Sequence, residues 1–360
     1  AAAPIGNTVA IVAAMIVFRV VAGPDAGLAL TTTEKVILGL GGTLGVAAFV
    51  ALPVIDLRRR GFRLRPRVAP RDPAVRRLLR LSGWAVLQHT GAALLLGAAI
   101  ILGGAVEGGV IAYRVAYYVF LAPYGILAQP IHTAVTPELA TDAAKQDLGG
   151  FSTAVRWGLD SLSLTVLPVS AAIVALSIPL MQVIAFGEAD TVAGVELMAA
   201  AAASLALGLM AYGAFRLLAG AYYALGDSRT PALVAMASAI VGVVFMVMAS
   251  ASTDGTAKIF VLGLGHSVAF VTSSIALAVR LRRRVHEPLF PRALLPAALV
   301  AAALAAGAWL TVEAWDPSGR VTTAAALAVV GAAGGALWWG AVKVLRLAPP
   351  RLVAGAGVVA

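Results

Sequence analysis

The chain has 360 residues, of which 61% are hydrophobic and only 12% are charged. Soluble proteins carry about 25% charged residues, so this composition excludes an ordinary water-soluble domain and indicates a protein that lies in a bilayer. Cysteine is absent, which excludes disulfides and thiolate metal sites, and the 4 histidines lack metal-binding spacing. We therefore expect neither a metal nor a cofactor.

Ten apolar segments long enough to cross a membrane follow one another along the chain. Each contains about 20 mostly apolar residues and ends at Gly, Pro or clustered charges. The predicted spans are 4–22, 35–56, 78–102, 109–133, 155–184, 195–225, 230–250, 258–280, 292–312 and 321–345. The third is the weakest of them, because Gln88, His89 and Thr90 interrupt its apolar run. The pattern predicts an all-α polytopic membrane protein with about ten transmembrane helices.

Basic residues gather in alternate loops between these spans, and the other loops are mainly acidic. Segment 57–77 is rich in Arg, and further Arg residues follow the eighth span in 281–291. Basic loops stay in the cytoplasm, so we predict that 57–77, 226–230, 281–291 and both chain ends face it. The net charge of +10 is thus explained by topology and contact with membrane lipids. No aromatic residues are interleaved for base stacking, so we expect no nucleic-acid binding.

Charged and polar side chains inside the spans are the candidate site, because such groups are costly in a bilayer. Arg216 lies about ten residues from the loop at Gly226, which is too deep for easy snorkelling. Arg114 lies beside Tyr118, about one turn inside the outer end of its span. Two explanations of this charge stay open, which are snorkelling of the side chain to the interface and a functional role. Ordinary interhelical hydrogen bonding is the alternative for the deep histidines. The predicted substrate-binding residues are Arg216, Arg114, His89, Gln88 and Tyr118.

Sequence motifs of catalysis are missing from the spans. We find no P-loop, no GxSxG and no paired carboxylates inside a span, so we do not expect an enzyme or an ATPase. The first residues, AAAPIGNTVA, contain neither a starting Met nor a basic region, so they do not form a signal peptide. We expect that an upstream part of the protein precedes them.

Two stretches resemble the MurJ/MviN family of lipid II flippases. YYALGDSRTPALVAM at 222–236 resembles the cytoplasmic connection in which a FYAL-x-D-[ST]-[RK]-TP pattern opens the next span. LAPYGILAQPIHTAVTPELA at 121–140 resembles the LP-x-G-[IL] pattern at the end of an earlier span. VIAFGEADTVAG at 183–194 is a shortened form of an LFG-x-G-[AE]-F segment. The spacing of the first two stretches also fits the family.

The resemblance implies that the chain is the last ten of fourteen helices. Residues 1–56 would be the last two helices of an N-terminal lobe, and 57–77 a basic cytoplasmic loop. Residues 78–280 would be a six-helix C-terminal lobe, and 281–360 two appended helices with a cytoplasmic tail. The implied location is the bacterial cytoplasmic (inner) membrane.

The implied function is translocation of the lipid-linked peptidoglycan precursor lipid II by alternating access, with arginine pairing with the lipid pyrophosphate. The implied partners are that lipid-linked saccharide pyrophosphate, membrane lipids and cell-wall synthesis proteins. Two alternatives stay open: an exporter of another polyprenyl-linked saccharide or a drug, and a non-transporting scaffold. A drug-cation exporter should carry acidic residues in its cavity, whereas the deep charges here are Arg and His.

The sequence departs from the family pattern at several charged positions. Where many members have arginine, this chain has Tyr118 and Gly220, with Arg114 and Arg216 one turn earlier on the same helix faces. The carboxylates and Asn of the sodium site that some members have are absent, and Thr272 occupies one candidate ligand place. We therefore do not expect sodium coupling.

Overall fold

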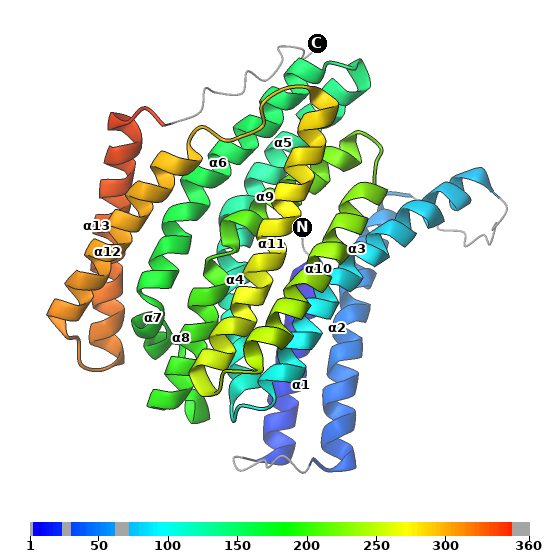
Figure 1. The fold of residues 1–360 in the computed structure, drawn as a ribbon. Helices are drawn as coiled ribbons and strands as arrows, with labels where there is room; N and C mark the ends of the chain where they lie inside the picture. Colours follow the sequence, from blue (N-terminus) through cyan, green and yellow to red (C-terminus); the bar gives the residue numbers. More distant parts are fainter. Residues whose placement is uncertain (1–2, 24–29, 62–71, 348–360) are drawn as a thin grey trace. The chain divides into compact units, whose positions relative to one another are not determined.

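The computed structural model describes residues 3–23, 30–61 and 72–347, and every regular element in these ranges is helical (Figure 1). Two compact units divide the chain, Ala1–Val75 and Arg76–Ala360. Each unit is described by itself.

The first unit is a helical pair, α1 (Ala3–Ala22) and α2 (Thr32–Arg59). Thr31 and Glu34 form a capping box that fixes the start of α2. The two buried residues of α2, Gly41 and Gly45, face α1 and allow the helices to pack closely. Arg19 donates to the carbonyl of Gly23 at 2.7 Å, so it caps the end of its own helix.

The second unit is a bundle of long helices that run roughly alongside one another (Figure 1). Its elements are α3 (Pro73–Gly103), α4 (Gly109–Pro123), the π-helix η1 (Tyr124–Ala128), α5 (Gln129–Lys145), α6 (Leu148–Ala175), α7 (Ser177–Ile184), the 3₁₀ turn η2 (Gly187–Ala189), α8 (Val192–Ala206), α9 (Leu209–Ala224), α10 (Arg229–Ser250), α11 (Gly255–Val285), α12 (Leu294–Trp315) and α13 (Arg320–Val344). One apolar core is shared by the helices from α3 to α11. The last two helices pack on α6 and α7.

The prediction of about ten membrane helices is confirmed. Within the described residues, 9 helices are long and apolar enough to cross a membrane, and the count reaches 10 with the bent pair α8–α9. Several helices extend beyond the predicted spans: α11 continues through its basic end to Val285, and the fourth span continues to Lys145. Arginine favours helix, and positive charge near a helix C-terminus is stabilised by the helix dipole, so α11 continues through its basic residues.

Three predicted spans are interrupted rather than continuous. The fourth contains η1 directly after Pro123, whose ring nitrogen cannot donate a helical hydrogen bond. The fifth breaks at Leu176, between α6 and α7. The sixth bends by 44° between α8 and α9. At that bend a Cβ on Gly208 would lie 2.7 Å from the Cα of Ser267, so the close contact with α11 requires glycine.

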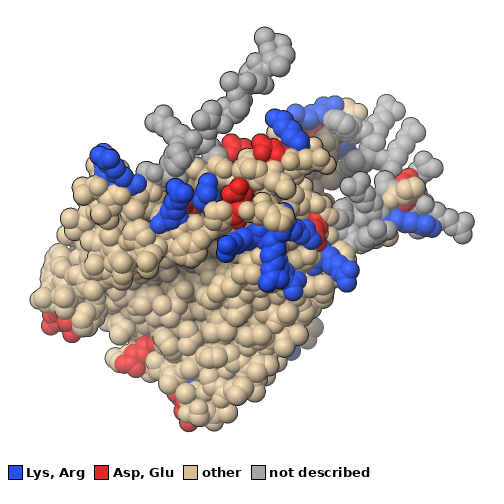
Figure 2. All heavy atoms as spheres, turned by 45° about the horizontal axis from the view of Figure 1, so that its top comes forward, with Lys and Arg blue, Asp and Glu red and all other residues tan. Residues whose placement is uncertain are grey.

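The α9–α10 and α11–α12 connections lie at the same end of the second unit. An ion pair of 2.7 Å between Asp227 and Arg284 joins them. Lys and Arg gather at this end in Figure 2. The start of α10 and the end of α11 carry the exposed residues Arg229, Arg280, Arg282, Arg283 and Arg284. The predicted cytoplasmic segments 226–230 and 281–291 are therefore on one side, whereas residues 62–71 of the predicted segment 57–77 lie outside the described residues.

Candidate functional site

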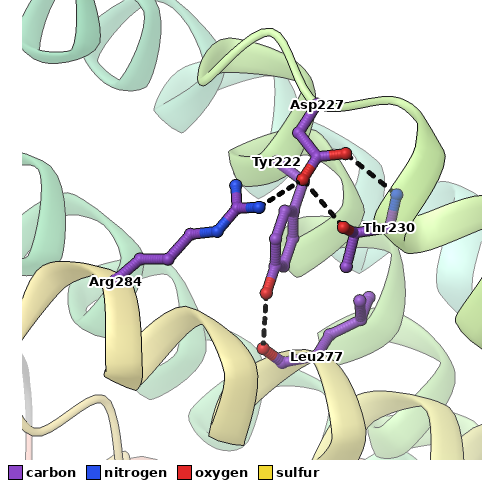
Figure 3. A network of polar contacts seen from close by, with 5 residues as sticks. All are labelled: Tyr222, Asp227, Thr230, Leu277 and Arg284. Carbon is purple, nitrogen blue, oxygen red and sulfur yellow. Dashed lines mark hydrogen bonds and ion pairs between the residues drawn. The ribbon is translucent and has the colours of Figure 1, made fainter.

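The YYALGDSRTP stretch forms the turn between α9 and α10 (Figure 3). Gly226 turns the chain with a φ of +74°, a left-handed conformation that favours glycine. Asp227 then accepts hydrogen bonds from the backbone N–H and the hydroxyl of Thr230, at 2.9 and 2.8 Å. This satisfies a donor in the first turn of α10, as an N-cap does.

The same turn is tied to α11 by Arg284, whose guanidinium donates to Asp227 at 2.7 Å and lies 5.2 Å from the ring centre of Tyr222. The Tyr222 hydroxyl donates to the carbonyl of Leu277 at 3.3 Å (Figure 3). Partial burial raises the pKa of Asp227, but the hydrogen bonds from Thr230 and Arg284 outweigh it and hold that pKa below its ordinary value. Asp227 is thus a carboxylate at neutral pH, and its ion pair with Arg284 links the α9–α10 turn to α11.

Arg216 lies further inside the bundle, on α9. It is eight residues from Ala224 at the helix end, which places it about 12 Å along the axis. Its side chain is half-buried, and its Nε–H donates to the hydroxyl of Tyr124 at 3.3 Å. Among the residues that the structure describes, no carboxylate pairs with it. The charge of Arg216 is therefore not neutralised within the described part of the protein.

Tyr124 holds Arg216 through a small polar cluster around η1. The Tyr124 hydroxyl is 3.1 Å from Oε1 of Gln129 and 3.1 Å from Nδ1 of His132. His132 Nε2 is 3.2 Å from the carbonyl of Gly213, which can only accept, so the ring proton is assigned to Nε2 and Nδ1 is an acceptor. The π-helix thus provides the tyrosine that contacts the arginine, and α5 provides Gln129 and His132, which contact that tyrosine. π-Bulges often occur at functional sites.

A cavity of about 110 Å³ lies beside Arg216, between α3, α9, α10 and α11. Its wall includes Gln88 and His89 of α3. Gln88 is buried, and its Oε1 accepts a hydrogen bond from the Tyr223 hydroxyl. The structure therefore brings together three of the five predicted residues, Gln88, His89 and Arg216.

The other two predicted residues, Arg114 and Tyr118, lie on α4 and do not line this cavity. Both are exposed, and their spacing of four residues puts them on one helix face. Beyond η1, further exposed polar residues continue on α5: Gln129, Thr133 and Thr136. These five residues are called the α4–α5 face below. The hydroxyls of Thr133 and Thr136 bond to carbonyls of their own helix, at 3.0 and 2.6 Å.

The buried His266 of α11 makes an interhelical hydrogen bond, which is the alternative given above for the deep histidines. Its Nδ1 lies 2.7 Å from the hydroxyl of Tyr113 on α4. Its Nε2 is buried without a hydrogen-bond partner in the described part of the chain. Rings of Tyr113 and Phe270 pack against it, with centroids 5.8 and 5.9 Å away. His266 therefore joins α4 to α11.

The family model described as "Lipid II flippase MurJ" matches residues 1–329 of this chain. The chain belongs to the MurJ lipid II flippase family. The resemblance of the two motif stretches is thereby confirmed. The match extends from α1 into α13, so it covers both units.

One MurJ relative is a protein of Synechocystis sp. named "Probable lipid II flippase MurJ", which is 34% identical over 121 residues. That alignment covers 33% of this chain and 22% of the relative, so the chain matches well under two thirds of the relative's length. A solved structure, "Lipid II flippase MurJ, inward closed conformation", superposes with a TM-score of 0.70 and 13% identity. It covers 96% of this chain and 67% of the solved chain, which shows a shared fold. The protein is therefore a multi-pass membrane protein of the MurJ fold.

The two displaced arginines keep the helix faces of the MurJ pattern. Arg114 and Tyr118 are both exposed on α4, and Arg216 and Gly220 are one turn apart on α9. The sequence did not indicate Tyr124, His132 and Gln129 as neighbours of Arg216. Tyr124 is in the LAPYG stretch, but its contact with Arg216 spans 92 positions of sequence, and no local spacing predicts it.

Proposed function

We propose that this chain is the larger part of a flippase that moves lipid II across the bacterial cytoplasmic membrane by alternating access. Its ligand would be a lipid-linked saccharide pyrophosphate, which it would move without a catalysed reaction. Membrane lipids and cell-wall synthesis proteins are the proposed partners. Membership of the MurJ family supports this proposal, and the α4–α5 face is the structural observation on which it rests.

The α4–α5 face is polar and exposed along a segment that is apolar enough to span a membrane. Exposed polar side chains at membrane depth are unfavourable against lipid, so such a face is expected to line a water-filled route. Arg114 would meet the pyrophosphate there, because a guanidinium pairs with phosphate through two parallel hydrogen bonds. Tyr118, Gln129 and the threonines would bind the polar headgroup.

Arg216 would act on the same ligand from the cavity, with Gln88 and His89 as polar neighbours. Its positive charge is not neutralised, and a low-dielectric environment extends the reach of that charge. None of the residues that line the cavity is acidic, which disfavours a drug-cation exporter. The charge pattern therefore supports an anionic lipid as the ligand.

The proposed orientation places the end with Asp227 and Arg284 in the cytoplasm, with both chain ends on that side. The cluster of arginines at the end of α11 supports it through the positive-inside rule. Arg283→Cys on this cysteine-free background gives a direct test. We expect an impermeant thiol reagent added to intact cells to leave position 283 unlabelled, and labelling from outside would reverse the orientation.

The transport proposal is tested with the full-length parent protein in cells depleted of their own flippase. Precursor in the outer leaflet is measured at matched expression levels. Arg114→Lys keeps the charge and should retain partial transport, whereas Arg114→Glu should lower transport by more than about tenfold. Arg19→Glu is the matched control, because Arg19 caps its own helix. Equal transport by wild type and Arg114→Glu would argue against the α4–α5 face as the ligand route.

A further inference from the structure

The cavity beside Arg216 is rich in hydrogen-bond donors. A guanidinium has five N–H groups, and only Nε–H has an acceptor among the described residues, the Tyr124 hydroxyl. Gln88 accepts from Tyr223 through Oε1, so its NH₂ group stays free to donate. Ser273, another lining residue, donates to the carbonyl of Phe270 at 2.9 Å. The free donors thus lie on two helices that face each other across the cavity.

Apart from His89, the rest of the cavity wall is apolar or aromatic, and includes Ala92, Leu95, Phe215 and Ala239. Its volume of about 110 Å³ is several times the 10–15 Å³ that one water molecule needs. A buried charge without a partner is costly, and an ion of opposite sign removes much of that cost. One guanidinium, one free amide group and a wall without carboxylates suit a single small negative charge better than a metal cation.

We propose that this cavity binds one small monovalent inorganic anion of halide size, held by Arg216 and the amide of Gln88. The anion neutralises Arg216 whenever no lipid headgroup does so. A pyrophosphate carries more than one negative charge, so the single cation of the cavity wall neutralises a small monovalent anion more completely. This binding site does not depend on transport, so either proposal can fail without the other.

The test is thermal unfolding of the purified full chain in detergent, with chloride as the probe. Sodium chloride is compared with sodium gluconate at equal ionic strength, and both are repeated as choline salts. Gluconate is too large for the cavity, so we expect only chloride to raise the melting temperature, by about 2–4 °C. The rise should be the same with choline, because the site takes the anion.

Three variants test whether chloride raises the melting temperature by binding in the cavity. Arg216→Gln should remove the chloride-dependent rise, and Arg114→Gln, which removes a charge from another helix face, should keep it. Ala92→Leu fills the cavity from an exposed position and leaves every charge in place, so it should also remove the rise. It therefore tests the site even where Arg216→Gln does not fold.

Four outcomes would overturn the proposal. The first is an equal effect of chloride and gluconate, and the second is a chloride effect that survives in both Arg216→Gln and Ala92→Leu. The third is a rise that requires sodium, which would make the cavity a cation site. The fourth is stabilisation by geranyl pyrophosphate through Arg216 without any stabilisation by chloride, which would make it a subsite for lipid phosphate.

Discussion

Arg284 and Arg216 belong to the same unit and both contact a tyrosine, yet their surroundings differ. Arg284 lies at the end of α11, where it is about half exposed and pairs with Asp227 at 2.7 Å. Arg216 is half-buried beside a cavity, and its hydrogen-bond partner in the described residues is a neutral hydroxyl. The comparison separates a charge that joins helices from a charge that is left available for a ligand.

The largest effect on stability is expected when the ion pair between Asp227 and Arg284 is removed. Asp227→Ala removes the cap of α10 and leaves Arg284 without its partner, so the free energy of unfolding should fall by about 2 kcal/mol. Asp227→Asn keeps an acceptor oxygen and should cost about half as much. Thermal unfolding in detergent measures both, and an unchanged melting temperature in Asp227→Ala would show that the ion pair does not hold the helices.

A smaller difference should separate the two arginines themselves. Arg284→Met should lower the free energy of unfolding by about 1 kcal/mol or less, because an exposed ion pair contributes little. Arg216→Met, measured in gluconate, should leave stability unchanged or raise it by about 1 kcal/mol, since it removes a half-buried charge that no described carboxylate neutralises. A marked loss of stability in Arg216→Met would show that Arg216 is structural, which would remove the contrast.

The smallest expected effect is the pH dependence of the stabilisation that Asp227 provides. The folded state lowers the pKa of Asp227, so its stabilisation is present above the ordinary value of about 3.9 and disappears as the pH falls through the folded-state pKa. The difference in melting temperature between wild type and Asp227→Asn should thus stay constant from pH 7 to about pH 5 and shrink below about pH 4. A difference that grows in acid would contradict the direction of the pKa shift.

The spans were predictable because the bilayer requires about 20 apolar residues for each crossing. Their interruptions were not, because η1 and the bend at Gly208 depend on contacts between helices. A proline such as Pro123 permits a π-helix without requiring one, and Pro168 lies within α6 without a break. The sequence shows where proline or glycine permits a helix to bend or to form a π-helix. Contacts between helices determine at which of these positions that happens.

The depth of Arg216 was predictable by counting residues from the end of the span, and its neighbours were not. Tyr124 and Gln88 lie on other helices, and only the folded bundle brings them to α9. The same limit applies to Arg114, because its spacing from Tyr118 puts both on one helix face, but only the fold shows that both are exposed. Local periodicity therefore locates single charged residues, and tertiary packing groups them.

The most direct test of the central claim is transport of precursor to the outer leaflet by Arg216→Glu in the full-length parent protein. Arg216→Lys keeps the charge, and Arg283→Glu is a matched charge reversal at an exposed position of the same unit. We predict partial transport by Arg216→Lys, near-normal transport by Arg283→Glu, and a loss of more than about tenfold in Arg216→Glu. Normal transport by Arg216→Glu at matched expression would contradict the claim that this unpaired cation serves an anionic lipid.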